Sequence, residues 1–270
     1  GTSRFAANLR LAEGVGAKKM VLHLWNGMVS DKNIQKNVER FGIWKDMADK
    51  EGISLLVENV ICNTHDPLYN MKLVAEAYAD AGFVYDTKMA EFHGQTMKLF
   101  EPEYEWIVRQ GRIKHLHLND YGGGYMDWGN MEVLPVGKGH VDFDMFLSRL
   151  MSYGYTGDCT VEATAVNENG GVDFYMLNDC FKRIRNLLFS TVGFLPARLL
   201  VIAAAMQMPT SQMQLGTSRA PNSYYSITAA RSAACAAKAA PKSAKLILVI
   251  TVTATRTFCS AKTRPWARRR

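Results

Sequence analysis

Acidic residues and a histidine recur where apolar segments of this sequence end. Glu58, Asp86, His117 and Glu162 each lie within or at the end of a different apolar run. If these runs are parallel strands, their carboxyl ends meet at one face of a sheet. Three carboxylates and one imidazole form a hard, oxygen-rich ligand set that suits Mn²⁺ or Mg²⁺, with Zn²⁺ or Co²⁺ as alternatives. One such acid is as often a helix cap or an ion-pair partner, but four in series favour a divalent-metal site.

Four further residues are candidates for contact with a substrate or for support of the site. His115 alternates with His117, so both side chains face the same side of a strand, and we expect His115 to lie behind the ligands. His23 ends the first apolar run and either contacts substrate or packs in the interior. Trp25 offers an apolar wall for a sugar ring, although tryptophan is more often a core residue. Lys138 lies in a loop where other polar residues would serve as well.

The elements that position these residues alternate between strand and helix. We expect strands at residues 20–24, 54–60, 83–85, 113–118 and 159–163, and helices at 31–50, 66–81, 91–110, from 142 onward, and 172–188. Such alternation predicts an α/β fold with a parallel sheet, either a barrel or a doubly wound sheet. No GxGxxG or Walker lysine follows a strand, so a nucleotide-binding fold has no support.

Aspartates mark the expected starts of three helices. Asp31, Asp66 and Asp142 each precede an amphipathic segment, and Pro67 follows Asp66 directly. A short acidic side chain accepts hydrogen bonds from the free backbone N–H groups of a first turn, and proline suits the first helical position. We therefore expect these aspartates to cap their helices.

Several short segments together resemble the xylose isomerase-like barrels, a family that comprises sugar and sugar-phosphate isomerases and epimerases and the endonuclease IV group. The resemblance spans residues 4–188, and the segments that carry it lie at 16–23, 57–59, 85–87, 115–120, 137–143, 154–157 and 161–162. Their order and spacing as a set are specific, although no single segment is.

The resemblance implies a partial (β/α)8 TIM barrel with about five C-terminal strand–helix units, in an N-terminally truncated copy that lacks three strands. It implies metal ligands at Glu58, Asp86, His117 and Glu162, with the two glutamates also serving as an acid/base pair. Five of eight strands would leave open edges at residues 20–24 and 159–163. We therefore expect this chain alone to have little or no activity.

Two activities within the family are open at this point. The first is a divalent-metal-dependent sugar or sugar-phosphate isomerase or epimerase, and the alternative is an endonuclease IV-like hydrolase at abasic sites in DNA, or an inactive fragment. The nuclease group needs extra histidines for three zinc ions, but Asp127-Trp128-Gly129 lacks the histidine of an Asp-x-His motif. Met89 also stands where the family often has a histidine. A single-metal isomerase or epimerase is therefore preferred.

The implied chemistry is proton transfer next to a carbonyl group. Removal of that proton gives an enediolate, whose charge on two neighbouring oxygens a divalent cation stabilises. Glu58 and Glu162, from separated strands, would flank the substrate and transfer the proton. Asp86 and His117 would mainly hold the metal. The expected partner is a small-molecule sugar, and no nucleic acid is expected.

Charged residues are unevenly distributed along the 270-residue chain, whose net charge is +7. Residues 1–180 hold all 25 acidic side chains and 17 basic ones, whereas residues 181–270 hold 15 basic side chains and no acid. We interpret 1–188 as the barrel domain and 189–270 as a basic, largely irregular extension that is not native to it. A basic arm for nucleic acid or anionic membrane is the alternative. Within the extension, 196–208 suggests a short apolar helix and 245–255 a β-prone run.

Composition narrows the class of protein. With 48% hydrophobic and 21% charged residues, the chain suits a globular protein. No apolar run reaches the roughly 18 residues of a membrane span, so no integral membrane protein is expected. Five cysteines without a CxxC motif argue against a disulfide scaffold or zinc ribbon and favour a reducing, cytoplasmic setting. Nothing in the sequence specifies an oligomeric state.

Overall fold

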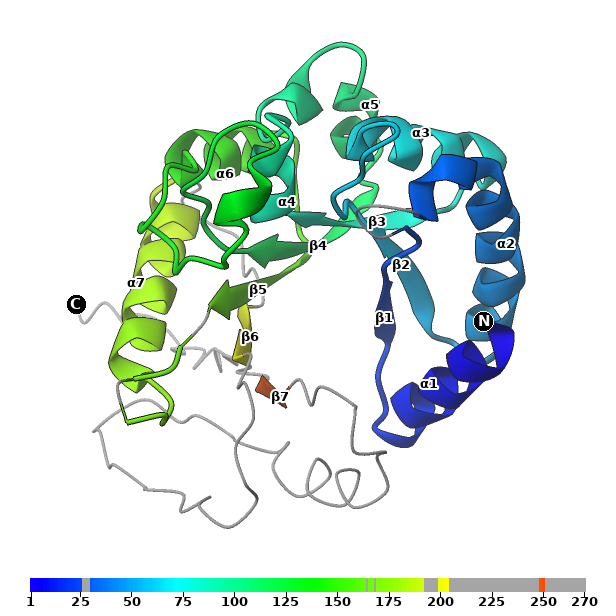
Figure 1. Cartoon of the computed structure of the whole chain (residues 1–270), viewed down its shortest axis with the longest axis horizontal. Helices are drawn as coiled ribbons and strands as arrows, with labels where there is room; N and C mark the ends of the chain where they lie inside the picture. Colours follow the sequence, from blue (N-terminus) through cyan, green and yellow to red (C-terminus); the bar gives the residue numbers. More distant parts are fainter. Residues whose placement is uncertain (26–29, 164, 168, 192–198, 204–247, 251–270) are drawn as a thin grey trace, which may run out of the picture.

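A parallel sheet forms the centre of the molecule. The computed structural model describes residues 1–25, 30–163, 165–167, 169–191, 199–203 and 248–250. Strands β1 (Lys19–Leu22), β2 (Ser54–Glu58), β3 (Gly82–Asp86), β4 (Ile113–Leu118) and β5 (Asp158–Ala163) pair in chain order, each parallel to the next. They curve into part of a barrel wall (Figure 1). The predicted partial TIM barrel is therefore confirmed.

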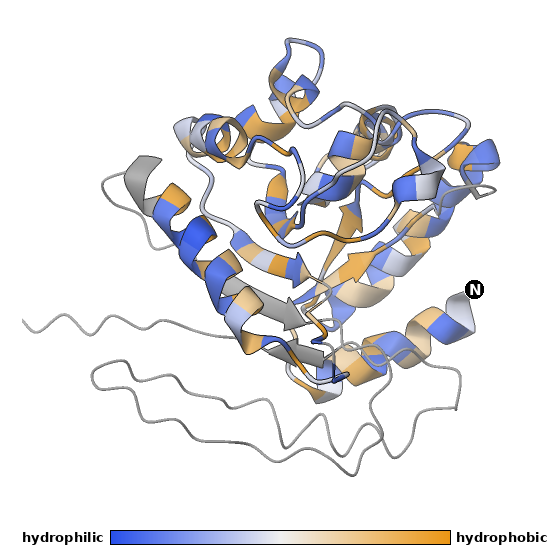
Figure 2. Cartoon of the chain, turned by 60° about the vertical axis from the view of Figure 1, so that its left-hand side comes forward, coloured by the Kyte–Doolittle hydropathy of each residue, from blue (hydrophilic) through white to orange (hydrophobic). Residues whose placement is uncertain are grey.

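Helices cover the outer side of this wall (Figure 1). They are α1 (Thr2–Gly14), α2 (Ile34–Lys50), α3 (Pro67–Ala77), α4 (Thr87–Phe92), α5 (Glu105–Arg109), α6 (Phe143–Ser152) and α7 (Phe174–Thr191), with 3₁₀ turns η1 (Ser30–Asn33), η2 (Lys98–Phe100) and η3 (Trp128–Asn130). Apolar residues concentrate on the strands and on helix faces turned toward them (Figure 2). No helix within the described ranges is long and apolar enough to cross a membrane.

Alternation along each strand separates a packed face from a polar one. Leu55 and Val57 of β2, with Phe83 and Tyr85 of β3, belong to the hydrophobic core that includes buried residues of the helices. Because successive side chains of a strand point to opposite faces, the residues between and after them face the barrel interior. Glu58 therefore points inward, away from the helices, at the end of its strand.

The strand register is staggered, as closure of a barrel requires. Glu58 pairs with Val84, so Asp86 lies two residues further along the barrel than Glu58. Asp86 pairs with His117, and His117 pairs with Thr160, two residues before Glu162. The inward-facing polar residues therefore lie progressively closer to the carboxyl ends of the strands from β2 to β5, with Asp86 and His117 at the same level.

Two predicted helix boundaries are wrong, and both have local reasons. The side chain of Asn33, and not that of Asp31, caps α2 by accepting a hydrogen bond from the Lys36 N–H. The predicted helix at 91–110 is split into α4, η2 and α5, since the chain turns at Gly94 with a φ of 60° and the α4 helix has already begun at Thr87. Asp66 and Asp142 cap α3 and α6 as predicted.

The edge of β5 was expected to be open, and this prediction is wrong. Strand β6 (Leu199–Ala203) pairs with β5 in parallel, and β7 (Leu248–Ile250) pairs with β6 in antiparallel orientation. The predicted helix at 196–208 is therefore a strand over its described part, because a short continuous apolar run also suits a parallel strand. Strand β7 falls within the predicted β-prone run. Most of residues 192–270 lies outside the described residues, and the domain boundary at 188 stays a prediction.

Candidate metal centre

Three of the four predicted ligands converge closely at the carboxyl ends of the strands. One ligand atom from each of Glu58, Asp86 and His117 lies within 4.8 Å of the other two, and all three residues are buried. Glu162 approaches from β5, with its Oε1 atom 3.4 Å from His117 Nδ1 and its side chain 28% exposed. We call these four residues the carboxylate–histidine cluster. Glu58, Asp86 and His117 end or nearly end three consecutive strands, which is why their side chains meet.

The donor set of this cluster suits a divalent cation. His117 Nδ1 lies 3.0 Å from Glu58 Oε1 and 3.9 Å from Asp86 Oδ2, so oxygens surround one nitrogen. Buried carboxylates without a cation repel one another, and a metal ion would offset that repulsion. Among the described residues this is the one group of three such side chains close enough to share an ion. Glu58, Asp86 and His117 could therefore bind a metal.

Burial and mutual charge set the protonation of the cluster. Burial raises the pKa of the Asp86 carboxyl, and the charges of Glu58 and Glu162 raise it further. Burial would lower the pKa of His117, but its hydrogen bond to Glu58 and the neighbouring carboxylates raise it to about 9. Burial would raise the pKa of Glu58, yet His117 and His23 outweigh it and lower that pKa. Near neutral pH the metal-free cluster thus pairs a Glu58 carboxylate with a His117 imidazolium.

His23 reaches the same cluster from the neighbouring strand. Its Nε2 atom lies 2.7 Å from Glu58 Oε2, and its side chain is 57% exposed. The hydrogen bond to Glu58 raises the pKa of His23, against the opposing effect of burial. His23 follows β1 directly, so the predicted site residue at this strand end does meet the predicted ligand on β2. The imidazole can pass a proton between Glu58 and solvent.

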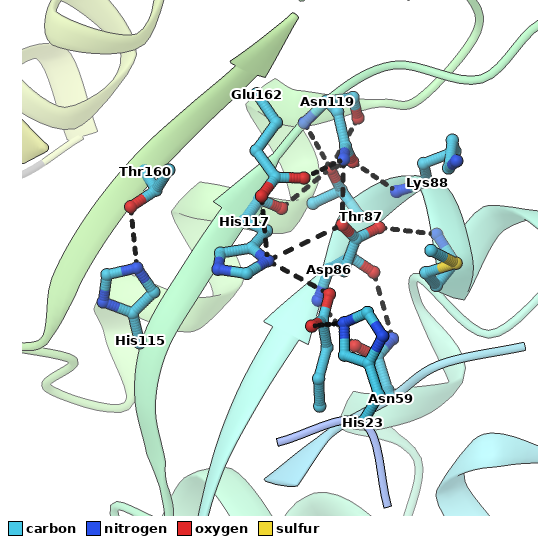
Figure 3. Close-up of polar contacts among 12 residues, drawn as sticks. His23, Asn59, Asp86, Thr87, Lys88, His115, His117, Asn119, Thr160 and Glu162 are labelled. Carbon is cyan, nitrogen blue, oxygen red and sulfur yellow. Dashed lines mark hydrogen bonds and ion pairs between the residues drawn. The ribbon is translucent and has the colours of Figure 1, made fainter. Parts of the chain in front are cut away.

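Asn119 belongs to the site, although sequence reasoning gave it no role. Its Nδ2 atom lies 2.8 Å from Asp86 Oδ2 and 3.2 Å from Glu162 Oε2 (Figure 3). Asp86 also caps α4, because its Oδ1 atom accepts a hydrogen bond of 2.7 Å from the Met89 N–H. The available signal was position alone: a polar residue directly after β4.

The remaining predicted residues lie around or outside the cluster. His115 lies beside His117 with ring centroids 5.3 Å apart, and its Nε2 atom is 2.7 Å from Thr160 Oγ1 (Figure 3). Burial and the charge of His117 lower the pKa of His115 to about 4. Trp25 is only 1% exposed and donates its indole N–H to the Val60 carbonyl, as a core residue does. Lys138 is exposed. The hydrogen bond from Arg183 lowers the pKa of Asp179 on α7, and the charge of Lys138 lowers it further.

A separate cavity of about 400 Å³ lies at the opposite end of the strands. Its lining includes Lys19, Ser54 and Gly82, the first residues of β1, β2 and β3. In barrels of this kind, conserved chemistry sits at the carboxyl ends of the strands, and the amino ends serve stability. The cavity is therefore distinct from the carboxylate–histidine cluster.

Comparison with known proteins agrees with this architecture. The solved IolI protein with a bound zinc atom is 17% identical, with a TM-score of 0.55, over 72% of this chain and 70% of that one. A xylose isomerase domain protein from Planctomyces limnophilus is 16% identical, with a TM-score of 0.53, over 72% and 67%. An L-ribulose 3-epimerase is 16% identical, with a TM-score of 0.50, over 70% and 67%. None of the curated proteins searched matches the chain.

At such identities these structures show a shared fold. The family model described as a xylose isomerase-like TIM barrel matches residues 2–174, which is more than half of the chain. This match covers the five strands β1 to β5 and every residue of the carboxylate–histidine cluster, and it ends where α7 begins. The chain therefore belongs to the family of xylose isomerase-like TIM barrels.

Proposed function

We propose that this chain carries the metal site of a divalent-metal-dependent isomerase or epimerase of sugars or sugar phosphates. The observation that carries the proposal is the convergence of Glu58, Asp86, His117 and Glu162 from four successive parallel strands. The names of similar structures, among them a D-tagatose 3-epimerase-like protein of 17% identity and an L-ribulose 3-epimerase, support this class of reaction.

Mn²⁺ or Mg²⁺ is the proposed ion, because carboxylate oxygens outnumber nitrogen in the donor set. The zinc atom in the IolI structure keeps Zn²⁺ as a candidate. Asp86 and His117 would hold the ion together with the two glutamates. When bound, the ion supplies stabilisation of the negative charge that develops on two neighbouring oxygens of the substrate.

Glu58 and Glu162 are the proposed acid/base pair. One carboxylate removes the proton from the carbon next to the substrate carbonyl, and a carboxylic acid then returns a proton to a carbon of the resulting enediolate. Both groups can exchange their protons: Glu162 is partly exposed, and Glu58 contacts the exposed His23. His23 is also the proposed substrate contact, since its exposed imidazole lies against the buried carboxylate of Glu58.

Metal titration of the chain tests the ligand assignment. Wild type should bind Mn²⁺, and His117→Ala should lose most of that binding, whereas His65→Ala, an exposed histidine outside the cluster, should not. Equal Mn²⁺ binding by wild type and His117→Ala would overturn the assignment.

Solvent exchange tests the proposed reaction. Because we expect this chain alone to have little or no activity, the measurement uses a chain extended to a complete barrel. With Mn²⁺ present, a panel of ketoses and ketose phosphates in D₂O should include one whose proton next to the carbonyl is replaced by deuterium, as seen by NMR. The Glu58→Gln and Glu162→Gln variants should each abolish this exchange. Cleavage of an abasic-site DNA duplex without any sugar exchange would favour a DNA hydrolase instead.

A further inference from the structure

One amide side chain joins two carboxylates that come from strands separated by a third. Asn119 follows β4 directly and is 1% exposed. Its Nδ2 atom donates to Asp86 Oδ2 on β3, at 2.8 Å, and to Glu162 Oε2 on β5, at 3.2 Å. In Figure 3, Asn119 lies between Glu162 and Lys88, next to Asp86 and Thr87.

The orientation of this amide is fixed by its other end. Asn119 Oδ1 accepts a hydrogen bond of 2.9 Å from the Lys88 backbone N–H and one of 3.2 Å from the Thr87 hydroxyl. A backbone N–H can only donate, so the oxygen of the amide must face Lys88. Both N–H groups of Nδ2 therefore point toward the carboxylates of Asp86 and Glu162.

The two hydrogen bonds determine which carboxylate oxygens face the cluster. Glu162 Oε2 accepts a hydrogen bond from Asn119, so the other oxygen, Oε1, faces His117 Nδ1 at 3.4 Å. Asp86 Oδ1 accepts a hydrogen bond from the Met89 N–H. The hydrogen bond from Asn119 holds Asp86 Oδ2 on the side that faces His117. A neutral amide that donates to both anions also offsets their mutual repulsion without adding a charge.

We infer that Asn119 is a positioning residue, which holds Asp86 and Glu162 in the arrangement that binds the divalent cation. This inference rests on the proposed metal-dependent function and goes beyond the ligand set. Hydrogen-bond partners of metal ligands orient those ligands, and their loss typically weakens metal affinity about 10–100-fold.

Asn59 provides a matched control in the same molecule. It is also 1% exposed and also follows a strand, next to Glu58. Within the part of the chain that the structure describes, its side chain bonds only to the backbone of Asp86: Nδ2 donates to the carbonyl at 3.0 Å, and Oδ1 accepts from the N–H at 2.6 Å. Asn59 and Asn119 thus differ in whether the amide touches carboxylate oxygens.

The test is a titration of the full chain with Mn²⁺ alone, with free Mn²⁺ followed by electron paramagnetic resonance. The variants are Asn119→Leu and Asn59→Leu, because leucine is neutral and has the same branched skeleton of side-chain heavy atoms as asparagine, without its hydrogen-bonding groups. We expect both to lower the melting temperature of the metal-free protein. Only Asn119→Leu should raise the Kd for Mn²⁺ about 10–100-fold, with a markedly smaller change in Asn59→Leu.

A second variant and a second measurement cover poor folding of Asn119→Leu. Asn119→Ala removes the amide without adding an apolar branch, and the rise in melting temperature that Mn²⁺ causes can be compared with that of wild type. Wild-type affinity in a folded Asn119 variant, or an equal loss in Asn59→Leu, would overturn the inference alone. Absence of Mn²⁺ binding in wild type would overturn both the inference and the proposed function.

Discussion

His23 Nε2 and Glu58 Oε2 lie 2.7 Å apart at the ends of the neighbouring strands β1 and β2. The His23 side chain is 57% exposed and the Glu58 side chain 3% exposed, so this contact connects solvent to the buried side of the cluster. In Figure 3, His23 and Glu162 lie on opposite sides of Asp86. The two proposed acid/base groups therefore have different routes for proton exchange: Glu58 through an imidazole and Glu162 directly.

Replacement of His23 should affect catalysis more than folding. We expect His23→Ala to lower kcat about 10–100-fold, because Glu58 loses a hydrogen-bond partner that orients it. The melting temperature should change little, since the imidazole is largely exposed. Steady-state kinetics of the chain extended to a complete barrel, on the sugar that shows solvent exchange, provides the measurement, with His65→Ala as the control. A kcat equal to that of wild type in His23→Ala would show that Glu58 works without this link.

Metal binding should release a proton near neutral pH. His117 has its pKa raised to about 9 in the metal-free protein and must lose its proton to become a ligand. The affinity for Mn²⁺ should therefore increase as pH rises from 6 to 8, by up to about ten-fold per pH unit. Isothermal titration calorimetry in two buffers of different ionisation enthalpy would count the protons. A Kd that stays constant over this range would contradict an imidazolium in the metal-free cluster.

The pH dependence of stability should include a contribution from His93. This histidine is 6% exposed, its Nε2 atom accepts the Cys62 N–H, and burial lowers its pKa to about 4. Because the folded pKa lies below the ordinary value of 6.5, the neutral form stabilises the fold above pH 6.5. That contribution is lost as pH falls from 6.5 toward 4.

Comparison with His93→Gln isolates this effect, since glutamine can accept the same N–H and does not titrate. Between pH 7 and pH 4, wild type should lose roughly 2 kcal/mol more unfolding free energy than the variant. Urea denaturation at both pH values gives the difference. An equal loss of unfolding free energy in the two proteins would mean that protonation of His93 does not destabilise the fold.

Much of the fold follows from patterns that depend on single strands and helices. A continuous apolar run predicted β2, because a strand buried on both faces has such a sequence. The alternation of short apolar segments with amphipathic ones predicted β3 to β5. The same patterns failed where a distant segment decides the structure. Residues 199–203 were predicted to be helical, because the apolar run itself contains no information about the free edge of β5, with which these residues pair. Asp31 read as a helix cap because its partners lie more than thirty residues away.

The candidate site was predictable to the extent that parallel strands place their carboxyl ends together. This geometry alone brings Glu58, Asp86 and His117 within reach of one another. It does not predict hydrogen bonds across the sheet, since those depend on the register between strands. The contacts of Asn119 with Asp86 and Glu162 arise from that register and from the turn after β4.

Asp31 should be more important for stability than the true cap of α2. Its Oδ2 atom accepts hydrogen bonds from the backbone N–H groups of Asn63, Thr64 and His65, and the residue is fully buried. We expect Asp31→Ala to lower the unfolding free energy by about 3 kcal/mol, because three buried N–H groups lose their acceptor. Asn33→Ala should cost about 1 kcal/mol, as usual for an N-cap. Equal losses would indicate that water replaces the Asp31 carboxylate.

Gly139 should tolerate no side chain, and this explains a glycine in the 137–143 segment. A Cβ atom at this position would overlap the Tyr121 carbonyl and Asp120 Oδ1. Asp120 holds this loop by accepting the N–H groups of Tyr121, Gly137 and Val141. Neither the backbone carbonyl nor a carboxylate with three hydrogen bonds can move aside cheaply.

We therefore expect Gly139→Ala to lower the unfolding free energy by at least about 2 kcal/mol. Gly124→Ala is the matched control, since a Cβ there meets no atom within 4 Å and its φ needs no glycine. That variant should leave stability unchanged or raise it by up to about 1 kcal/mol, through a less flexible unfolded chain. Chemical denaturation of both variants decides the matter. If Gly139→Ala is as stable as Gly124→Ala, the loop after β4 must be able to shift away from Asp120.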